Sequence, residues 1–403
     1  MFATPKLLRY GAGLLVLVLG ITVIISLLHR DESMRLPERQ FRLTDLLSAN
    51  DTMEFQHAEK GAKISLPAAL GLHPEYRTEW WYYTGNLTSV SGRRFGYELT
   101  FFRSGLSPGF IKASGSNWRT NQIYMAHFAV TDVENRQFHY AERFSRGAAG
   151  LAGAENTPFK VWLENWSVKE IATPSEFNIP NTHLTAENDK LSIALDLIPE
   201  KPPVLHGESG YSRKGADPDN ASFYFSVTRL NTRGMLKIGE KGFEVHGSSW
   251  LDREWGTSAL GPEMEGWDWF ALQLDNGRDL MYYRIRKNDG SASRYSAGSL
   301  VDSTGHTTQF QREEIELKIL DRWRNPDGVT YPSRWRMVIP DEQISLTITP
   351  LVADQELQTL IPYWEGAVSI SGTDSGRPVS GRGYVELTGY GGEPLTLNLP
   401  GKD

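Results

Sequence analysis

The sequence predicts an all-β protein in which two consecutive antiparallel barrel-like units follow one N-terminal transmembrane helix. Three features predict it: an apolar segment near the N-terminus, short runs of strand-forming residues after it, and an internal repeat. The chain has 403 residues, of which 39% are hydrophobic and 12 are Trp, so it can bury a large core and favours two domains.

The apolar segment runs from Tyr10 to His29 and contains no Asp, Glu, Lys or Arg. As a helix it would span about 30 Å, enough for one bilayer crossing. Because Lys6 and Arg9 precede it, we expect a cytoplasmic N-terminus and export of residues 31–403. A cleaved signal peptide is the alternative, but no A-x-A-like site follows the segment; a buried core helix is a third possibility.

Residues 31–69 are charge-dense at their start, and we expect a stalk or a short amphipathic helix there. From about Leu72 the chain turns into runs such as YELTFFR, YMAHFAVTDV and LSIALDLI, separated by Gly, Asn, Asp and Pro. Runs of this kind are typical of strands, and the lack of alternating strand and helix patterns favours antiparallel pairing.

An internal repeat divides the exported part. Glu79–Leu87 matches Gly266–Leu274 at an offset of 187, and Gly247-x-x-Trp250-x-Asp252 resembles Gly381-x-x-Tyr384-x-Glu386 at an offset of 134. Chance similarity between aromatic strands is the alternative. The repeat predicts units at 70–256 and 257–403, and the Pro- and Gly-rich residues 199–221 predict a long loop within the first.

Composition and motifs exclude several functions. The chain has no Cys, which rules out disulfides, thiolate metal sites and a thiol nucleophile, and its net charge of −7 disfavours nucleic acid as a partner. The nine His are scattered singly and no phosphate-binding loop occurs, so we expect no metal and no cofactor. The one G-x-S-x-G, at residues 105–109, is followed by loop-forming residues rather than a helix pattern.

The segment HGSSWLDREWG, residues 246–256, is the densest polar and aromatic cluster. On an extended strand, one face would carry the side chains of His246, Ser248, Trp250, Asp252 and Glu254. This face could hold an acid–base group in an aromatic cavity, or a buried polar network where the two units meet.

Further candidates come from three other segments. In EWWYYTGNL, residues 79–87, one face carries Glu79, Trp81 and Tyr83, and aromatics on both faces indicate a core strand or a ligand cavity. Asp268 lies between two indoles, where burial would favour a protonated carboxyl, although a surface position is equally consistent. The loop LHGESGYSRKG, residues 205–215, offers polar groups for a cavity mouth. The catalytic candidates are Asp252 and Asp268; the ligand-binding candidates are Glu79, Trp81, Tyr83, His127, His206, Tyr211, Lys214, His246, Trp250, Glu254, Trp255, Trp267, Trp269 and Tyr283.

Five ordered blocks resemble the AttH/CrtC lipocalin-like family: EWWYYTGNL, LHGESGYSRKG, HGSSWLDREWG, GWDWFALQLDNG and GRGYVELTGY. The resemblance covers about residues 70–395 and implies two consecutive lipocalin-like β-barrel domains. The family includes proteins labelled predicted secreted hydrolase, proteins encoded beside ABC transporters, and carotenoid hydratases. In the hydratase branch a carboxylic acid and aromatic residues protonate an isoprenoid double bond. This chain departs from that branch at Arg253-Glu254-Trp255 and at Tyr283-Arg284.

Two functions therefore stand beside each other. The first is a protein of the bacterial inner membrane, facing the periplasm, that binds an apolar molecule or lipid and works with an ABC transporter permease. The second is an enzyme that adds water to an isoprenoid double bond by acid catalysis. A secreted hydrolase is a third, for which the sequence supplies no nucleophile motif.

Overall fold

The computed structural model describes residues 40–41, 55–109, 116–174, 176–257, 260–261, 263–391 and 395–396. The predicted membrane helix, residues 10–29, lies outside this part of the chain. Within the described ranges, no helix has the length and apolar character needed to cross a bilayer. Strands β1 (Gln40–Phe41) and β25 (Leu395–Thr396) pair with each other in one unit, and all other elements belong to a second unit, residues 42–392.

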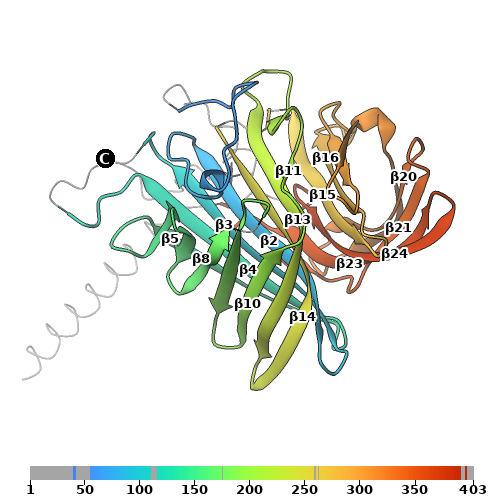
Figure 1. Ribbon diagram of the computed structural model, residues 1–403, viewed down its shortest axis with the longest axis horizontal. Helices are drawn as coiled ribbons and strands as arrows, with labels where there is room; N and C mark the ends of the chain where they lie inside the picture. The colour runs from blue at the N-terminus through green and yellow to red at the C-terminus, as the bar shows by residue number, and fades with distance from the viewer. Residues whose placement is uncertain are drawn as a thin grey trace, which may run out of the picture. The chain divides into compact units, whose positions relative to one another are not determined.

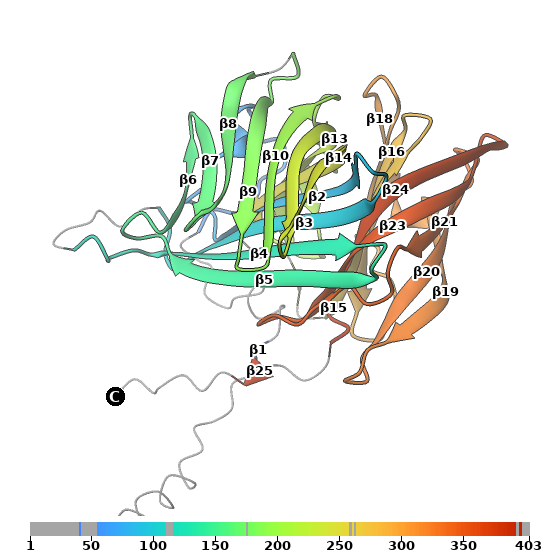
Figure 2. The same ribbon diagram turned by 90° about the horizontal axis from the view of Figure 1, so that it is seen from below.

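The described residues between 55 and 391 fold into two antiparallel sheets, coloured blue to yellow and yellow to red in Figures 1 and 2. The first sheet has the order β5-β4-β3-β2-β14-β13-β10-β9-β8-β7-β6, with β11 and β12 added to β13. Its strands are β2 (Thr78–Ser89), β3 (Arg94–Gly105), β4 (Gln122–Asp132), β5 (Gln137–Arg146), β6 (Ala152–Asn156), β7 (Phe159–Leu163), β8 (Trp166–Pro174), β9 (Pro180–Glu187), β10 (Leu191–Pro199), β11 (Val204–Leu205), β12 (Tyr211–Arg213), β13 (Ala221–Ile238) and β14 (Lys241–Gly256).

The second sheet has the order β18-β17-β16-β15-β24-β23-β21-β20-β19, with β22 added to β23. Its strands are β15 (Met264–Leu274), β16 (Asp279–Lys287), β17 (Ala297–Val301), β18 (Thr307–Gln311), β19 (Glu316–Arg324), β20 (Thr330–Ile339), β21 (Ile344–Pro350), β22 (Glu356–Leu357), β23 (Tyr363–Asp374) and β24 (Arg377–Leu387). The described helices are two short 3-10 turns, Ala68–Leu70 and Arg312–Glu314. Both sheets curl into nearly closed barrels, so the all-β prediction is confirmed.

The predicted repeat is confirmed by strand pairing. In each sheet the first long strand pairs with the last one, β2 with β14 and β15 with β24. Asp252 lies opposite Tyr82 in the first pair, and Glu386 lies opposite Trp269 in the second. These four residues are related by the same offsets that the sequence shows, so Asp252 and Glu386 occupy equivalent positions. The boundary between two folding domains stays a prediction.

Alternation along the strands sorts side chains into three cores. Odd-numbered residues of β2, such as Trp81 and Tyr83, point into the first barrel, and an equivalent core fills the second. Even-numbered Tyr82 joins a third core between the sheets, together with Trp250 and Trp269. Packed side chains fill both barrel interiors, and an aromatic cavity lies where the barrels meet.

Two sequence predictions need correction here. The described part of the predicted stalk, residues 55–69, packs on the first sheet, since Ala58 and Ala69 are buried in its core. The carbonyl of Leu70 also accepts a hydrogen bond of 2.7 Å from the indole of Trp81. The predicted loop 199–221 is not free of pairing, because strands β11 and β12 form within it between the prolines.

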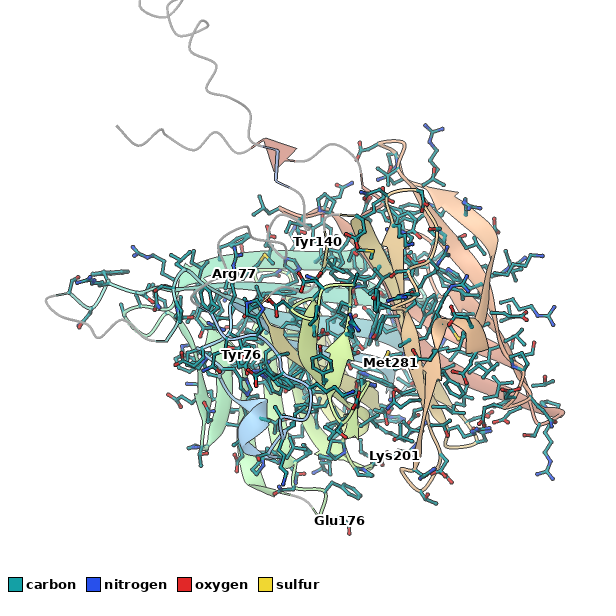
Figure 3. The ribbon with its side chains drawn as sticks, turned by 90° about the horizontal axis from the view of Figure 1, so that it is seen from above. Tyr76, Arg77, Tyr140, Glu176, Lys201 and Met281 are labelled. Atoms are coloured by element: carbon teal, nitrogen blue, oxygen red, sulfur yellow. The ribbon has the colours of Figure 1, made fainter. Side chains whose placement is uncertain are left out.

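The contact between the sheets is close and contains unusual polar groups. A Cβ added to Gly96 would meet the Ala367 Cβ at 2.4 Å, so only Gly allows this approach. Lys201, from the first sheet's chain segment, pairs with Asp279 of β16 at 2.7 Å, and Figure 3 labels Lys201 and Met281 near this contact.

Two fully buried carboxyls, Glu98 and Glu365, lie at this same contact. Burial raises the pKa of Glu98, and burial together with the neighbouring Glu386 and Glu98 raises the pKa of Glu365. Among the described residues neither carboxyl has a cationic partner. Both are therefore held in their neutral form inside the fold.

We expect Glu98→Gln to stabilise the protein increasingly as the pH rises. The folded protein retains the Glu98 proton while the unfolded chain releases it, so the wild type loses up to about 1.4 kcal/mol per pH unit between the two pKa values. Gln does not titrate and avoids this loss. Thermal unfolding of both proteins at about pH 5 and about pH 8 tests this expectation. The exposed Glu240→Gln is the control. An equal difference in stability between Glu98→Gln and the wild type at the two pH values would contradict the prediction.

Candidate functional site

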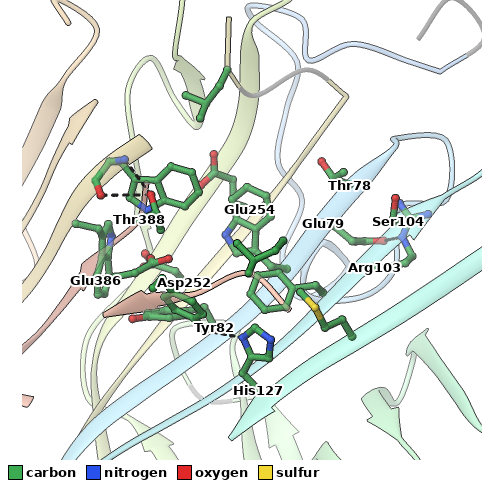
Figure 4. A pocket seen from close by; sticks show the side chains of 18 of the residues that line it. Thr78, Glu79, Tyr82, Arg103, Ser104, His127, Asp252, Glu254, Glu386 and Thr388 are labelled. Atoms are coloured by element: carbon green, nitrogen blue, oxygen red, sulfur yellow. Dashed lines mark hydrogen bonds and ion pairs between the residues drawn. The ribbon is translucent and has the colours of Figure 1, made fainter. Parts of the chain in front are cut away.

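A cavity of about 240 Å³ opens between the two sheets. Its walls come from both repeats, and most of them are aromatic or aliphatic. The lining residues include Trp80, Tyr82, Phe102, Ile123, Met125, His127, Phe144, Lys214, Tyr224, Asp252, Glu254, Leu260, Trp267, Trp269, Tyr283, Ile285, Tyr363 and Glu386. Figure 4 shows Asp252, Glu386 and Tyr82 grouped on one side of the cavity and Glu79 with Arg103 on the other.

Asp252 is a carboxyl of the cavity wall with three side-chain hydrogen-bond partners. Its Oδ1 lies 2.6 Å from the indole nitrogen of Trp250 and also contacts the Ser226 hydroxyl, while Oδ2 contacts the Tyr224 hydroxyl. Burial raises the pKa of Asp252 to about 7, although the hydrogen bonds that Ser226, Tyr224 and Trp250 can donate to the carboxylate form oppose this shift. Near neutral pH both the acid and the carboxylate form of this side chain are therefore populated.

Tyr224 connects Asp252 with the second sheet. Its hydroxyl accepts a hydrogen bond of 3.0 Å from the indole nitrogen of Trp269 on β15. The Tyr82 ring packs edge-on against Trp269 at 5.0 Å between centroids. The position of Asp252 is thus fixed by side chains from both repeats.

Lys214 and Glu254 form a charged pair at the cavity, 3.3 Å apart. Burial works against the charged amine, but the carboxylate of Glu254, together with Tyr283 and Asp252, outweighs it and raises the pKa of Lys214. The ammonium lies 3.9 Å from the ring centroid of Tyr283 and 4.8 Å from that of Tyr224. These ring faces are therefore arranged to stabilise positive charge.

Glu386 is the second carboxyl beside Asp252. Burial raises its pKa to about 8, against a hydrogen bond from Trp267 and with the help of the charges on Asp252 and Glu254. On the neighbouring strand it faces Glu365, whose carboxyl contacts the Tyr82 hydroxyl. Two groups able to hold a proton near neutral pH thus line one aromatic cavity.

Glu79 also lines the cavity, but its carboxylate is bound in a cluster of buried ion pairs. It is fully buried and pairs with both Arg103 and Arg253. Burial opposes the charged form, but the two guanidinium groups outweigh it and hold the pKa of Glu79 well below its usual range. This cluster ties β2, β3 and β14 together, because each strand supplies one member.

The structure brings half of the sequence candidates to the cavity. Those that line it are Glu79, His127, Lys214, Asp252, Glu254, Trp267, Trp269 and Tyr283. His206 and Trp250 lie behind Asp252, in contact with its network. Trp81, Tyr83 and Trp255 belong to the first barrel's core, and Tyr211 and His246 lie elsewhere on the first sheet.

Asp268, the other catalytic candidate, lies outside the cavity lining. Its buried carboxylate pairs with the guanidinium of Arg286 and accepts a hydrogen bond of 2.8 Å from the Tyr390 hydroxyl. Because strand alternation directs it away from Trp267 and Trp269, it contacts cations rather than the two indoles beside it in sequence. The structure thus does not place it to protonate a ligand.

Sequence reasoning missed Tyr82, Tyr224, Tyr363 and Glu386 as site residues. The sequence could have indicated Glu386, since the repeat offset of 134 maps Asp252 onto it. It could not have indicated Tyr224, because the approach of Tyr224 to Asp252 follows from the register of β13 against β14. Tyr363 reaches the first sheet, where its hydroxyl lies 2.7 Å from Nδ1 of His127.

No group of three or more His, Asp or Glu side chains arranged to bind a metal ion occurs in the described ranges.

Two curled sheets with a polar and aromatic cavity between them define a lipocalin-like double-barrel protein. The chain belongs to the AttH-like family, whose model matches residues 57–390. An AttH protein from Nitrosomonas europaea has a solved structure that is 32% identical, with a TM-score of 0.73, and the match covers 83% of this chain and 100% of that one.

A kievitone hydratase from Nectria haematococca has a similar fold at 17% identity and a TM-score of 0.61, over 83% of this chain and 98% of that one. No curated protein matches the chain. The family resemblance that the sequence predicts is thus confirmed.

We expect Glu79→Gln to destabilise the protein by about 3–5 kcal/mol, because it leaves two buried guanidinium groups without their carboxylate. Urea unfolding followed by Trp fluorescence measures the loss. The matched control is Glu342→Gln, which removes a partly exposed partner of Arg278 and is expected to cost at most about 1 kcal/mol. A loss for Glu79→Gln no larger than that of the control would contradict a structural role.

Proposed function

We propose that this protein is an acid–base enzyme of the hydratase type, which adds water to a carbon–carbon double bond of an apolar substrate. The observation that carries the proposal is the position of Asp252, a carboxyl with a pKa near 7 in the wall of an aromatic cavity. General acids work best when their pKa lies near the working pH.

In the proposed reaction the protonated Asp252 gives its proton to one carbon of the double bond. The π electrons form the new C–H bond and leave a carbocation at the other carbon. A water oxygen then bonds to this carbon and releases one proton, which a cavity carboxylate takes up. The carboxylate of Asp252 is available for this step once it has lost its own proton, and Glu386 lies beside it.

The aromatic walls suit a cationic intermediate. The rings of Tyr224 and Tyr283 already attract the ammonium of Lys214, so they offer the same electron-rich faces to a carbocation. Trp80, Phe102 and Met125 would bind the apolar part of an isoprenoid-like substrate. The fold similarity to kievitone hydratase is consistent with hydration chemistry.

We expect Asp252→Asn to lower hydration by about 100-fold or more, because Asn cannot donate the proton. Wild-type activity should fall as the pH rises through about 7, since the acid form of Asp252 is lost there. Geraniol, farnesol and squalene incubated in ¹⁸O-labelled water, with mass spectrometry of the products, provide the measurement. Asp302→Asn, at a partly exposed position outside the cavity lining, serves as control, and unchanged turnover in Asp252→Asn would exclude this role.

Binding of an apolar ligand without chemistry is the second candidate, favoured by the aromatic lining of the cavity. Anchoring in a bacterial inner membrane and work with an ABC transporter permease belong to this candidate and stay predictions. Hydrolysis has less support, because the two serines that contact His206, Ser226 and Ser299, do not line the cavity.

We expect Trp80→Ala to weaken binding of an isoprenoid ligand about tenfold or more, since a ligand that covers this half-buried indole gains roughly 1.5–3 kcal/mol of apolar contact. Native mass spectrometry and the shift in melting temperature with farnesol measure it. Trp118→Ala removes an exposed indole outside the cavity lining and should bind as the wild type does. Equal affinity of the two variants would place the ligand elsewhere.

A further inference from the structure

A line of polar side chains leads from Asp252 away from the cavity and into the second sheet. Ser226 contacts Oδ1 of Asp252 and lies 2.6 Å from Nε2 of His206. On the other side of the imidazole, Nδ1 lies 2.8 Å from the Ser299 hydroxyl, which is 2.7 Å from Oε1 of Gln309. We call these five residues the Asp252 chain; Ser226, His206 and Ser299 are buried, and Gln309 is exposed.

The outer end of the Asp252 chain is a hydrogen-bond acceptor. The amide nitrogen of Gln309 faces the carbonyl of Leu205 at 3.2 Å, and its oxygen faces the backbone N–H of Gly207 at 3.4 Å. These two contacts fix which end of the amide meets Ser299. The Ser299 hydroxyl therefore donates to Gln309, and its oxygen is left to accept a proton from His206.

His206 is a neutral imidazole at the middle of the chain. Burial and the nearby charge of Lys214 lower its pKa well below the usual value. A neutral imidazole that donates from Nδ1 has only an acceptor at Nε2. Ser226 must then donate its proton to His206, which leaves the Ser226 oxygen facing Asp252 as an acceptor.

The proton count of the chain now decides the state of Asp252. Four contacts join the five groups, and each needs one proton. Ser299, His206 and Ser226 supply one each, so the fourth must come from the carboxyl of Asp252. A carboxylate there would leave one of the four contacts with two acceptors facing each other.

We propose that the Asp252 chain holds Asp252 in its acid form, with Ser226, His206 and Ser299 as positioning residues that act through this carboxyl. This inference rests on the proposed function, in which Asp252 donates the proton. It adds that the acid is assembled from both repeats, because His206 precedes β12 and Ser299 lies on β17 of the second sheet.

In the described part of the chain, the equivalent carboxyl of the second repeat has no such line of side chains. The residue opposite Glu386 is Glu365, where the first repeat has Ser226, and Glu365 contacts Tyr82 instead of a histidine. The repeat therefore differs between its copies at the residue that links the carboxyl to an imidazole. This difference assigns the role of acid to Asp252 and not to Glu386.

Other titratable groups also surround Asp252, and their charges affect its titration midpoint. They are Tyr224 on β13, Glu254 on β14, Glu386 on β24, and Lys214 and His206 on the segment between β11 and β13. The variants chosen below leave the first four unchanged.

Ser299→Ala and His206→Phe test the inference. Without the Ser299 oxygen, the imidazole can move its proton to Nε2 and donate to Ser226; without the imidazole, Ser226 has no acceptor there. In both variants the Ser226 hydroxyl turns to Asp252 and stabilises its carboxylate. We expect the titration midpoint of Asp252 to fall by about one pH unit or more.

The midpoint is measured by ¹³C NMR of the full-length protein with labelled Asp carboxyls, assigned by the signal that Asp252→Asn removes. Ser299→Thr keeps the hydroxyl and should retain the wild-type midpoint, as should Ser296→Ala, a buried serine bonded only to backbone groups. Ser299→Ala carries the test alone if His206→Phe does not fold.

An unchanged or raised midpoint in Ser299→Ala, or a wild-type Asp252 that is ionised well below neutral pH, would overturn the inference. The NMR readout does not depend on turnover. A lowered midpoint without hydration of any probe would support the chain and argue against the proposed function. If hydration occurs, the loss of activity with rising pH should move to lower pH in Ser299→Ala by the same amount as the NMR midpoint.

Discussion

The packing of β2 and β14 of the first sheet against β15 and β24 of the second is the contact on which the site depends. Each of these strands buries one face in its own barrel and turns the other toward the partner barrel. The amide of Asn86 donates to the carbonyl of Gly383, and the amide of Gln273 donates to the carbonyls of Thr228 and Ser249. Both repeats therefore contribute residues to the cavity walls, and neither barrel alone would contain the site.

This contact also explains why so many ionisable groups sit in their neutral form. Glu98 and Glu365 are buried between the sheets with no cationic partner among the described residues, whereas Glu79, on the barrel side of β2, has two guanidinium partners. The same fold thus holds carboxylates where it supplies positive charge and carboxylic acids where it does not. Asp252 lies between these extremes, because hydrogen bonds oppose the effect of burial.

The repeated strand pair supplies both carboxyls that face the cavity, one from each copy. Asp252 and Glu386 line the cavity from equivalent positions of β14 and β24. Their surroundings differ, since Ser226 and His206 accompany the first and Glu365 the second. A repeated strand pair can in this way give two groups with the same placement and different proton affinities, which is what acid–base chemistry requires.

The sequence by itself determined the all-β class, the repeat and the faces of the strands, because strand alternation has a fixed period of two and aromatic strands are recognisable in isolation. It therefore placed Trp250, Asp252 and Glu254 on one face correctly. Only the tertiary structure decided that this face meets the second barrel, that Asp268 is bound by Arg286, and that Tyr224, His206 and Ser299 gather around Asp252. Those contacts depend on strand register and on how two barrels pack, which join residues far apart in the chain and leave no local pattern.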